Sequence, residues 1–357
     1  MNFWSFVKKF DWVLLVLALG ILTLAMLTFN QSGPKGITTI EKEFIFILGG
    51  LVVMFLVSVV DYRIFKNNSA PSVALYVLAC FLLVLALGFP AVRGSRAWVH
   101  IGFGFQPSEF AKLAILILLA KYFSQKHVEI YRFHHILASG LYVALPAGLV
   151  LLQPDLGSMM VFVCLWLAML FFAGIKRKHL LAIVMVGLVL ASFAWFFGLK
   201  PYQKDRIISF VNPYIDPRGI GYNAIQAQTT FGSGQIFGTF FTGKKMAVMV
   251  PEQYTDFTFS AFGQKFGFVG VIVLIGLLVA LIIRIGSIAT RSHNNFAKLF
   301  SLGLITLISV HAFLNAGMNL GILPITGIPF PFLSYGGSNL MTLMMGLGIV
   351  ESIHLRG

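Results

Sequence analysis

The chain has 357 residues, of which 58% are hydrophobic and only 11% are charged. Water-soluble domains are nearer about 45–50% apolar and about 25% charged, so the composition excludes a soluble globular protein. It also excludes a disordered chain, which requires low hydrophobicity. The net charge of +14 does not indicate nucleic-acid binding, because no basic block with interleaved aromatic residues lies outside the apolar runs. Basic cytoplasmic loops that meet anionic membrane lipid explain the charge.

Apolar runs of about 20 residues, the length that crosses a bilayer as a helix, recur along the sequence. They predict an all-α polytopic membrane protein of about ten transmembrane helices, with residues 1–357 as a single integral membrane domain. The predicted helices cover residues 12–29, 44–60, 72–90, 108–122, 135–152, 158–174, 179–198, 267–284, 298–318 and 339–355. Residues 199–266, between the seventh and eighth helices, are predicted to form a long loop outside the cytoplasm.

The predicted orientation follows from the distribution of Lys and Arg, because cytoplasmic loops carry an excess of basic residues. With the N-terminus inside, fourteen basic residues fall at the inner side and four in the short outer loops. Both termini are therefore predicted to face the cytoplasm. The inner residues are Lys8, Lys9, Arg63, Lys66, Lys121, Lys126, Arg132, Lys176, Arg177, Lys178, Arg284, Arg291, Lys298 and Arg356, and the outer residues are Lys35, Lys42, Arg93 and Arg96.

Two residues of opposite charge lie in the first turns of the fourth predicted helix. Pro107 suits the start of a helix, and the i, i+3 spacing of Glu109 and Lys112 places both side chains on one face. Charges at membrane depth are costly and usually functional. Two interpretations stay open, namely a structural ion pair that holds two helices together and a polar wall of a substrate cavity.

Asp155 follows Pro154 between the fifth and sixth predicted helices. Proline ends the preceding helix, and an aspartate at this position is well suited to cap the next one. The alternative is that Asp155 faces the same outer cavity as Lys112.

The loop 199–266 is too long for an idle connection, and it is rich in glycine, aromatic and amide residues, Gln226 among them. Residues 225–236 are predicted to form a helix at the membrane interface. Asp256 lies near the end of the loop among aromatic residues that exclude water. This setting suits a general base, while an exposed or capping aspartate is the competing interpretation.

Polar residues also mark the last two predicted helices. His311, Asn315 and Asn319 form one stripe on the ninth helix, which favours hydrogen bonds to neighbouring helices. Ser338 follows two glycines at the start of the tenth helix and is predicted to be its N-cap. The alternative is that the free N–H groups of this helix receive a phosphate or a carbonyl group.

Taken in chain order, these motifs resemble those of the SEDS family, the shape, elongation, division and sporulation proteins of bacteria. The similarity covers essentially the whole chain. The motifs are residues 105–112, 153–157, 212–213, 221–223 with Gln226, 232–234, 251–252 with 255–257, 323–327 and 334–338.

The resemblance implies a peptidoglycan glycosyltransferase of the bacterial cytoplasmic membrane that polymerises lipid II at the outer face. It also implies a class B penicillin-binding protein, a transpeptidase, as partner. The family's catalytic aspartate corresponds to Asp256, which would act as general base. The family's polar cavity residues correspond to Glu109, Lys112 and Asp155. No second carboxylate is evident as a nucleophile, so the transfer is expected to invert the configuration at the reacting carbon.

The leaving pyrophosphate requires cationic stabilisation, for which Lys112, Arg206 and Arg96 are candidates. A divalent cation, Mg²⁺ or Mn²⁺, is a further candidate. Gln226 and Ser338 complete the expected substrate-binding residues.

Two departures from the family pattern are present, and two alternative functions stay open. The family's glycine-rich stretch after residues 232–234 is thinned here, in residues 235–243. Gln264 and Lys265 stand where the family often has two acidic residues. Any step that requires a carboxylate is therefore expected to depend on Asp256. A transporter that flips lipid II would use the same polar cavity without a base. A scaffold that only recruits a transpeptidase would need no catalytic residue.

Overall fold

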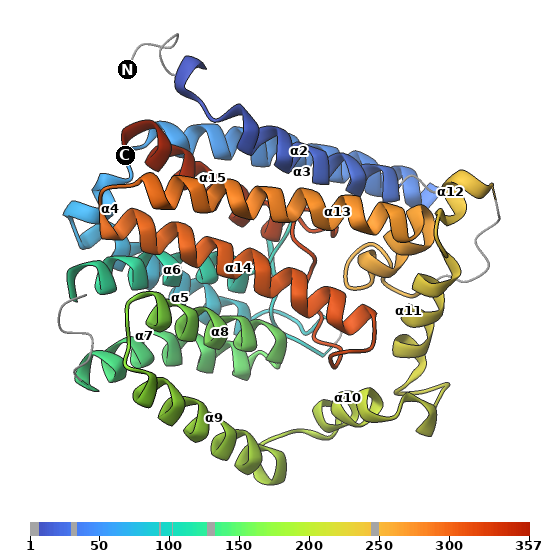
Figure 1. The fold of residues 1–357 in the computed structure, drawn as a ribbon. Helices are drawn as coiled ribbons and strands as arrows, with labels where there is room; N and C mark the ends of the chain where they lie inside the picture. The colour runs from blue at the N-terminus through green and yellow to red at the C-terminus, as the bar shows by residue number, and fades with distance from the viewer. Residues whose placement is uncertain (1–6, 30–33, 93, 102, 127–132, 244–249) are drawn as a thin grey trace.

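A computed structural model describes residues 7–29, 34–92, 94–101, 103–126, 133–243 and 250–357. Long helices dominate the described part of the chain, and they lie side by side in a bundle (Figure 1). The helices are α2 (Trp12–Phe29), α3 (Pro34–Val59), α4 (Arg63–Asn67), α5 (Ala70–Leu87), α6 (Pro107–Lys126), α7 (Phe133–Leu152), α8 (Leu156–Phe172), α9 (Arg177–Phe197), α10 (Pro201–Val211), α11 (Tyr222–Ser233), α12 (Gly238–Thr242), α13 (Thr258–Arg291), α14 (Asn295–Asn319) and α15 (Gly337–Arg356).

A helix lies at each of the ten predicted positions, and α2 has the predicted bounds. Seven of the described helices are long and apolar enough to cross a membrane, namely α2, residues 40–59 of α3, α5, α7, α9, α13 and α14. The apolar helix α8 is shorter, and the polar residues in α6 and α15 interrupt their apolar sequence. The all-α membrane architecture is therefore confirmed, and the number of ten membrane crossings stays a prediction.

The core of the bundle is built around α14, which packs against α6, α8 and α13. The helix pairs α3 with α15, α2 with α13, and α5 with α6 extend the bundle on either side. The helix α9 stands apart at its edge (Figure 1), and its large apolar side chains such as Leu190 and Phe197 are exposed. This exposure is expected of a helix that faces lipid.

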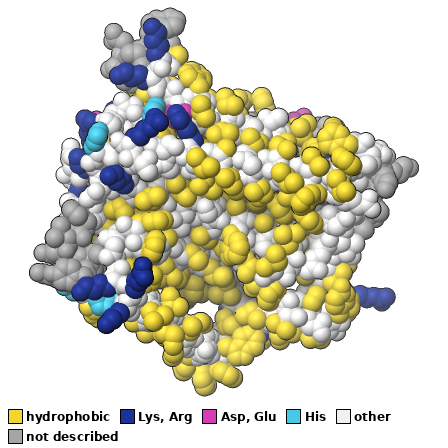
Figure 2. All heavy atoms as spheres, in the orientation of Figure 1, with side chains coloured by type: hydrophobic (Ala, Val, Ile, Leu, Met, Phe, Trp, Pro, Cys, Tyr) yellow, Lys and Arg dark blue, Asp and Glu magenta, His cyan; other side chains and the backbone are white. Residues whose placement is uncertain are grey.

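The two ends of the bundle differ in what they carry. Both termini lie at one end, and the segment with α10, α11 and α12 lies at the other (Figure 1). Figure 2 shows that most of the Lys and Arg side chains visible on this face gather at the end with the termini. This distribution agrees with the predicted orientation, in which the termini face the cytoplasm.

The connection 199–266 contains more helix than the sequence predicts. It contains α10, the 3-10 turn η1 (Pro213–Ile215), α11, α12 and the first turns of α13. These helices are short and partly polar, so no long apolar run reveals them. Residues 222–233 form α11, close to the helix predicted at 225–236.

Gly267 divides α13 into two helical parts. Its backbone is not helical, with φ 66° and ψ −169°, a conformation that glycine adopts at little cost. The longer part begins where the eighth membrane helix is predicted, and the shorter part, residues 258–266, precedes the break. The N–H of Phe268 donates to the carbonyl of Gln235 at 2.9 Å, so the break also lets the chain bond to the turn after α11.

Candidate functional site

The start of α6 is held in place by a β-hairpin and by α15. The strands β1 (Val99–Ile101) and β2 (Phe103–Phe105) pair antiparallel and lead into the helix through Pro107. The N–H of Gln106 donates to the hydroxyl of Ser338 at 2.9 Å. The prediction that Ser338 caps α15 is wrong, because Gly336 occupies the N-cap and no side chain caps the helix. Ser338 instead joins α15 to α6.

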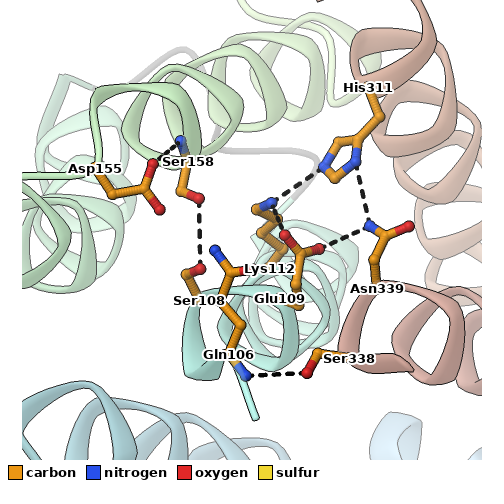
Figure 3. Close-up of polar contacts among 9 residues, drawn as sticks. All are labelled: Gln106, Ser108, Glu109, Lys112, Asp155, Ser158, His311, Ser338 and Asn339. Atoms are coloured by element: carbon orange, nitrogen blue, oxygen red, sulfur yellow. Dashed lines mark hydrogen bonds and ion pairs between the residues drawn. The ribbon is translucent and has the colours of Figure 1, made fainter. Parts of the chain in front are cut away.

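Glu109 and Lys112 form a buried ion pair inside the bundle (Figure 3). The Lys112 Nζ lies 2.7 Å from Glu109 Oε1, and the side chains are 0% and 2% exposed. The other carboxylate oxygen, Oε2, accepts from the amide of Asn339 at 2.9 Å. Each charge therefore has an opposite charge or a hydrogen bond that compensates its burial.

His311 joins this network from α14. Its Nε2 lies 3.2 Å from the Lys112 Nζ, and the ring also hydrogen-bonds the backbone of Pro329. A lysine ammonium can only donate, so Nε2 accepts from it, and the other ring nitrogen, Nδ1, lies 3.4 Å from the amide nitrogen of Asn339. The four side chains of Glu109, Lys112, His311 and Asn339 thus connect α6, α14 and α15.

The ion pair that the spacing allows is present, and it lies away from solvent. Lys112 is fully buried, so a ligand that met its ammonium would first have to enter the bundle. Whether Glu109 and Lys112 bind substrate stays a prediction.

Asp155 caps α8, as one of its two interpretations predicts. Its Oδ1 accepts from the N–H of Ser158 at 3.0 Å, and Figure 3 shows the pair beside the start of α6. The hydroxyl of Ser158 donates to that of Ser108 at 3.4 Å. The turn also bonds the segment before β1, because the N–H of Arg96 donates to the carbonyl of Gln153 at 3.3 Å. Arg96 and Asp155 therefore lie on one side of the bundle.

Asp256 lies in the turn just before α13, and two amides hold its backbone. The side chains of Asn315 and Asn319 donate to its carbonyl oxygen at 2.9 and 3.1 Å. Asn315 also donates to the carbonyl of Ile328 at 2.7 Å, and Asn319 accepts from the N–H of Ser260 at 3.0 Å. The polar stripe on α14 thus bonds neighbouring segments, as predicted, and fixes the position of Asp256.

The carboxylate of Asp256 faces the segment between α14 and α15. A Cβ atom added to Gly327 would lie 3.7 Å from Oδ2 of Asp256, so the glycine leaves room beside the carboxylate. Gly327 has φ +73°, where residues with side chains are strained. The side chain of Asp256 is partly exposed and can therefore meet a ligand more directly than Lys112 can.

Arg206 and Gln226 lie in the connection before α13. Arg206, on α10, is exposed and donates to the carbonyl of Ile325 at 3.4 Å, two residues before Gly327. It lines a cavity to which α11 contributes Gln228 rather than the predicted Gln226. Of the three predicted cations, Arg206 is the one that hydrogen-bonds the segment 325–327, and this segment lies beside Asp256.

Gln264 and Lys265 have structural partners in the short helical part of α13. The Lys265 Nζ donates to the carbonyls of Leu27 and Thr28 at 2.5 and 3.4 Å, at the end of α2. A cation is stabilising at the negative end of a helix. Gln264 donates to the hydroxyl of Ser233 at 3.0 Å. A carboxylate at position 265 would face these carbonyl oxygens, which explains why a lysine is suited to this chain.

Asn339 and Gln228 are polar residues to which the sequence assigns no role. Asn339 meets Glu109 from 230 positions away, and no spacing within one sequence reveals such a contact. The described residues contain no group of three or more His, Cys, Asp or Glu side chains placed to hold a metal ion.

A family model described as "Cell cycle protein", which covers the proteins FtsW, RodA and SpoVE, matches residues 8–356. The chain belongs to this family, the SEDS proteins. It is 33% identical to the peptidoglycan glycosyltransferase MrdB of Escherichia coli K12 over 99% of this chain and 95% of that protein. It is 31% identical to the peptidoglycan glycosyltransferase RodA of Treponema pallidum over 98% of each chain.

Solved structures of SEDS proteins share the fold. A chain described under "Structural coordination of polymerization and crosslinking by a peptidoglycan synthase complex" matches with a TM-score of 0.84 and 30% identity over 97% of each chain. The rod shape determining protein RodA of Thermus thermophilus matches with a TM-score of 0.72 and 29% identity over 97% of this chain and 96% of that one. The motifs of this SEDS chain are, within the family, most like those of RodA.

Proposed function

We propose that this SEDS protein is a peptidoglycan glycosyltransferase that joins lipid II molecules, with Asp256 as general base. Its family membership and the names of relatives that match almost its whole length support the activity. One observation carries the role of Asp256. Two amides hold its backbone while its carboxylate stays partly exposed beside Gly327.

The reaction requires one proton transfer and one displacement. The 4-hydroxyl of the acceptor GlcNAc attacks C1 of the donor MurNAc, and undecaprenyl pyrophosphate leaves with the bonding electron pair. The Asp256 carboxylate takes the hydroxyl proton, a contribution of about 10²–10⁴ in rate. A single displacement inverts the anomeric configuration from α to β.

The leaving pyrophosphate develops negative charge, which cations stabilise. The guanidinium group of Arg96 is exposed and is the cation proposed here for the pyrophosphate, whereas Arg206 lines a cavity beside α10. Lys112 could bind the pyrophosphate only after leaving Glu109 and His311. Mg²⁺ or Mn²⁺ also fits the proposal, because such ions commonly combine one or two carboxylates with substrate phosphates. Asp256, whose side chain is partly exposed, would be a carboxylate ligand of such an ion.

The reaction is proposed to occur at the outer face of the bacterial cytoplasmic membrane. The positive-inside count of the sequence and the position of Asp256 beside the connection 199–266 support this side. The partner is proposed to be a class B penicillin-binding protein, because a structural relative is described as part of a complex that coordinates polymerisation with crosslinking.

The test is polymerisation of lipid II by the purified chain, with and without a class B penicillin-binding protein whose transpeptidase serine is inactivated. We expect β-linked glycan strands, formed faster with the partner. Movement of lipid II across vesicles without strand formation would instead favour the flippase. Neither activity, with a stable complex, would favour the scaffold.

A further inference from the structure

A cavity of about 230 Å³ lies between α10, η1, α11 and the segment that follows α14. Arg206, Ser209, Tyr214 and Gln228 are its polar lining residues. Pockets for drug-sized ligands occupy about 300–1,000 Å³, so this cavity suits one ring rather than a disaccharide or a lipid chain.

The lining groups match a neutral, hydroxylated ring that carries an amide. Tyr214 is 70% exposed and offers an aromatic face with a polar edge. Gln228 supplies an amide with donors and an acceptor. Arg206 donates to Ile325 at 3.4 Å, and its guanidinium has five N–H donors in all. Among the described lining residues Arg206 is the charged one, whereas a pyrophosphate would require more positive charge.

One segment of chain, residues 325–327, lies beside both the cavity and Asp256. Ile325 lines the cavity, and Gly327, two residues later, faces the Asp256 carboxylate. Two residues of extended chain span at most about 7 Å. Met318 also lines the cavity, and the next residue, Asn319, donates to the Asp256 carbonyl. A ring in the cavity would therefore contact residues that adjoin those positioning the base.

We propose that this cavity is a carbohydrate subsite that holds one sugar ring of the glycan strand, beyond the two sugars that react. The proposal rests on the proposed function. A subsite beyond the reacting bond contributes to retaining the strand between additions rather than to forming each bond. Its loss should shorten the strands while leaving the first coupling of lipid II intact.

The first test compares strand lengths made by Tyr214→Ala, Gln228→Ala and the matched control Ile215→Ala. Ile215 is 63% exposed beside Tyr214 and does not line the cavity. The two lining variants should shorten the mean strand about threefold or more, as expected when one ring contact or hydrogen bond is lost, at an unchanged initial rate of lipid II consumption. The control should match the unsubstituted chain. Strands of unsubstituted length from both lining variants would overturn the subsite. Failure of the unsubstituted chain to make any strand would instead overturn the proposed function.

The second test measures binding of a lipid-free tetrasaccharide from peptidoglycan to the purified full chain by calorimetry. Tyr214→Ala should weaken binding about tenfold, a difference of about 1.4 kcal/mol, and Ile215→Ala should leave it unchanged. Inorganic pyrophosphate should not displace the sugar. Binding that is absent, insensitive to Tyr214→Ala, or displaced by pyrophosphate would contradict a sugar subsite.

Discussion

At the scale of single residues, the buried charges of Glu109 and Lys112 depend on one another. Taking two charges out of water is costly, and mutual attraction offsets the cost only when the remaining donors and acceptors are satisfied. His311 and Asn339 provide those further contacts. The network therefore ties three helices together, and it is expected to tolerate the loss of both charges better than the loss of one.

Replacing Lys112 alone tests this dependence. Lys112→Met leaves the Glu109 carboxylate buried without its cation, which should cost about 3–5 kcal/mol of stability. Glu109→Gln should destabilise the chain in the same direction. The double variant removes both charges and should unfold at a higher temperature than either single one. Thermal unfolding of the chain in detergent measures all three, and a double variant less stable than both singles would contradict the account.

At the scale of secondary structure, the break in α13 depends on Gly267. A Cβ atom added there would lie 2.4 Å from both the N of Gly238 and the carbonyl oxygen of Ile236. The break therefore brings two backbones together in a way that a side chain would prevent. It also separates the part of α13 that follows Asp256 from the long apolar part.

Gly267→Ala should destabilise the chain by about 1–3 kcal/mol or more, because a positive φ is strained for alanine and the close backbone approach would be lost. Gly276→Ala is the matched control, since Gly276 lies in the same helix with no atom within 4 Å of an added Cβ. Alanine is the better helix former there by about 0.5–1 kcal/mol. Opposite shifts in the unfolding temperature are expected. Equal shifts would show that the break does not require glycine.

Whether the sequence predicts a helix or a contact depends on how far apart along the chain the interacting residues lie. The apolar run of α2 determines both of its ends, and the spacing of Glu109 and Lys112 predicts their contact. The sequence predicts residues 258–266 as part of the connection rather than as a helix, because a short helix has no long apolar run. The bond from Ser338 to Gln106 joins positions 232 residues apart. No local pattern in one sequence specifies such a partner.

At the scale of the whole molecule, transfer at the outer face of the membrane requires the connection with α10 to α12 to lie outside the cytoplasm. Arg218 in that connection and Lys178 at the start of α9 are both exposed basic residues. In a chain with Cys80 and Cys164 replaced by alanine, Arg218→Cys should react with an impermeant thiol reagent added to intact cells. Lys178→Cys should react only after the membrane is opened. The reverse pattern would place the candidate base on the cytoplasmic side.

As the proposed general base, Asp256 accepts a proton during glycosyl transfer. Asparagine has nearly the same size and can form hydrogen bonds, but it cannot take up a proton at neutral pH. The backbone carbonyl that Asn315 and Asn319 bind is unchanged by Asp256→Asn, so the variant should fold, insert and bind its partner normally.

The most direct measurement is the rate of glycan strand formation from lipid II by purified Asp256→Asn, at matched protein level and in the presence of the partner. We expect the rate to fall by about 10² or more, the range expected for the loss of a general base, with an unchanged unfolding temperature. A rate close to that of the unsubstituted chain would contradict this expectation and would remove Asp256 as the base.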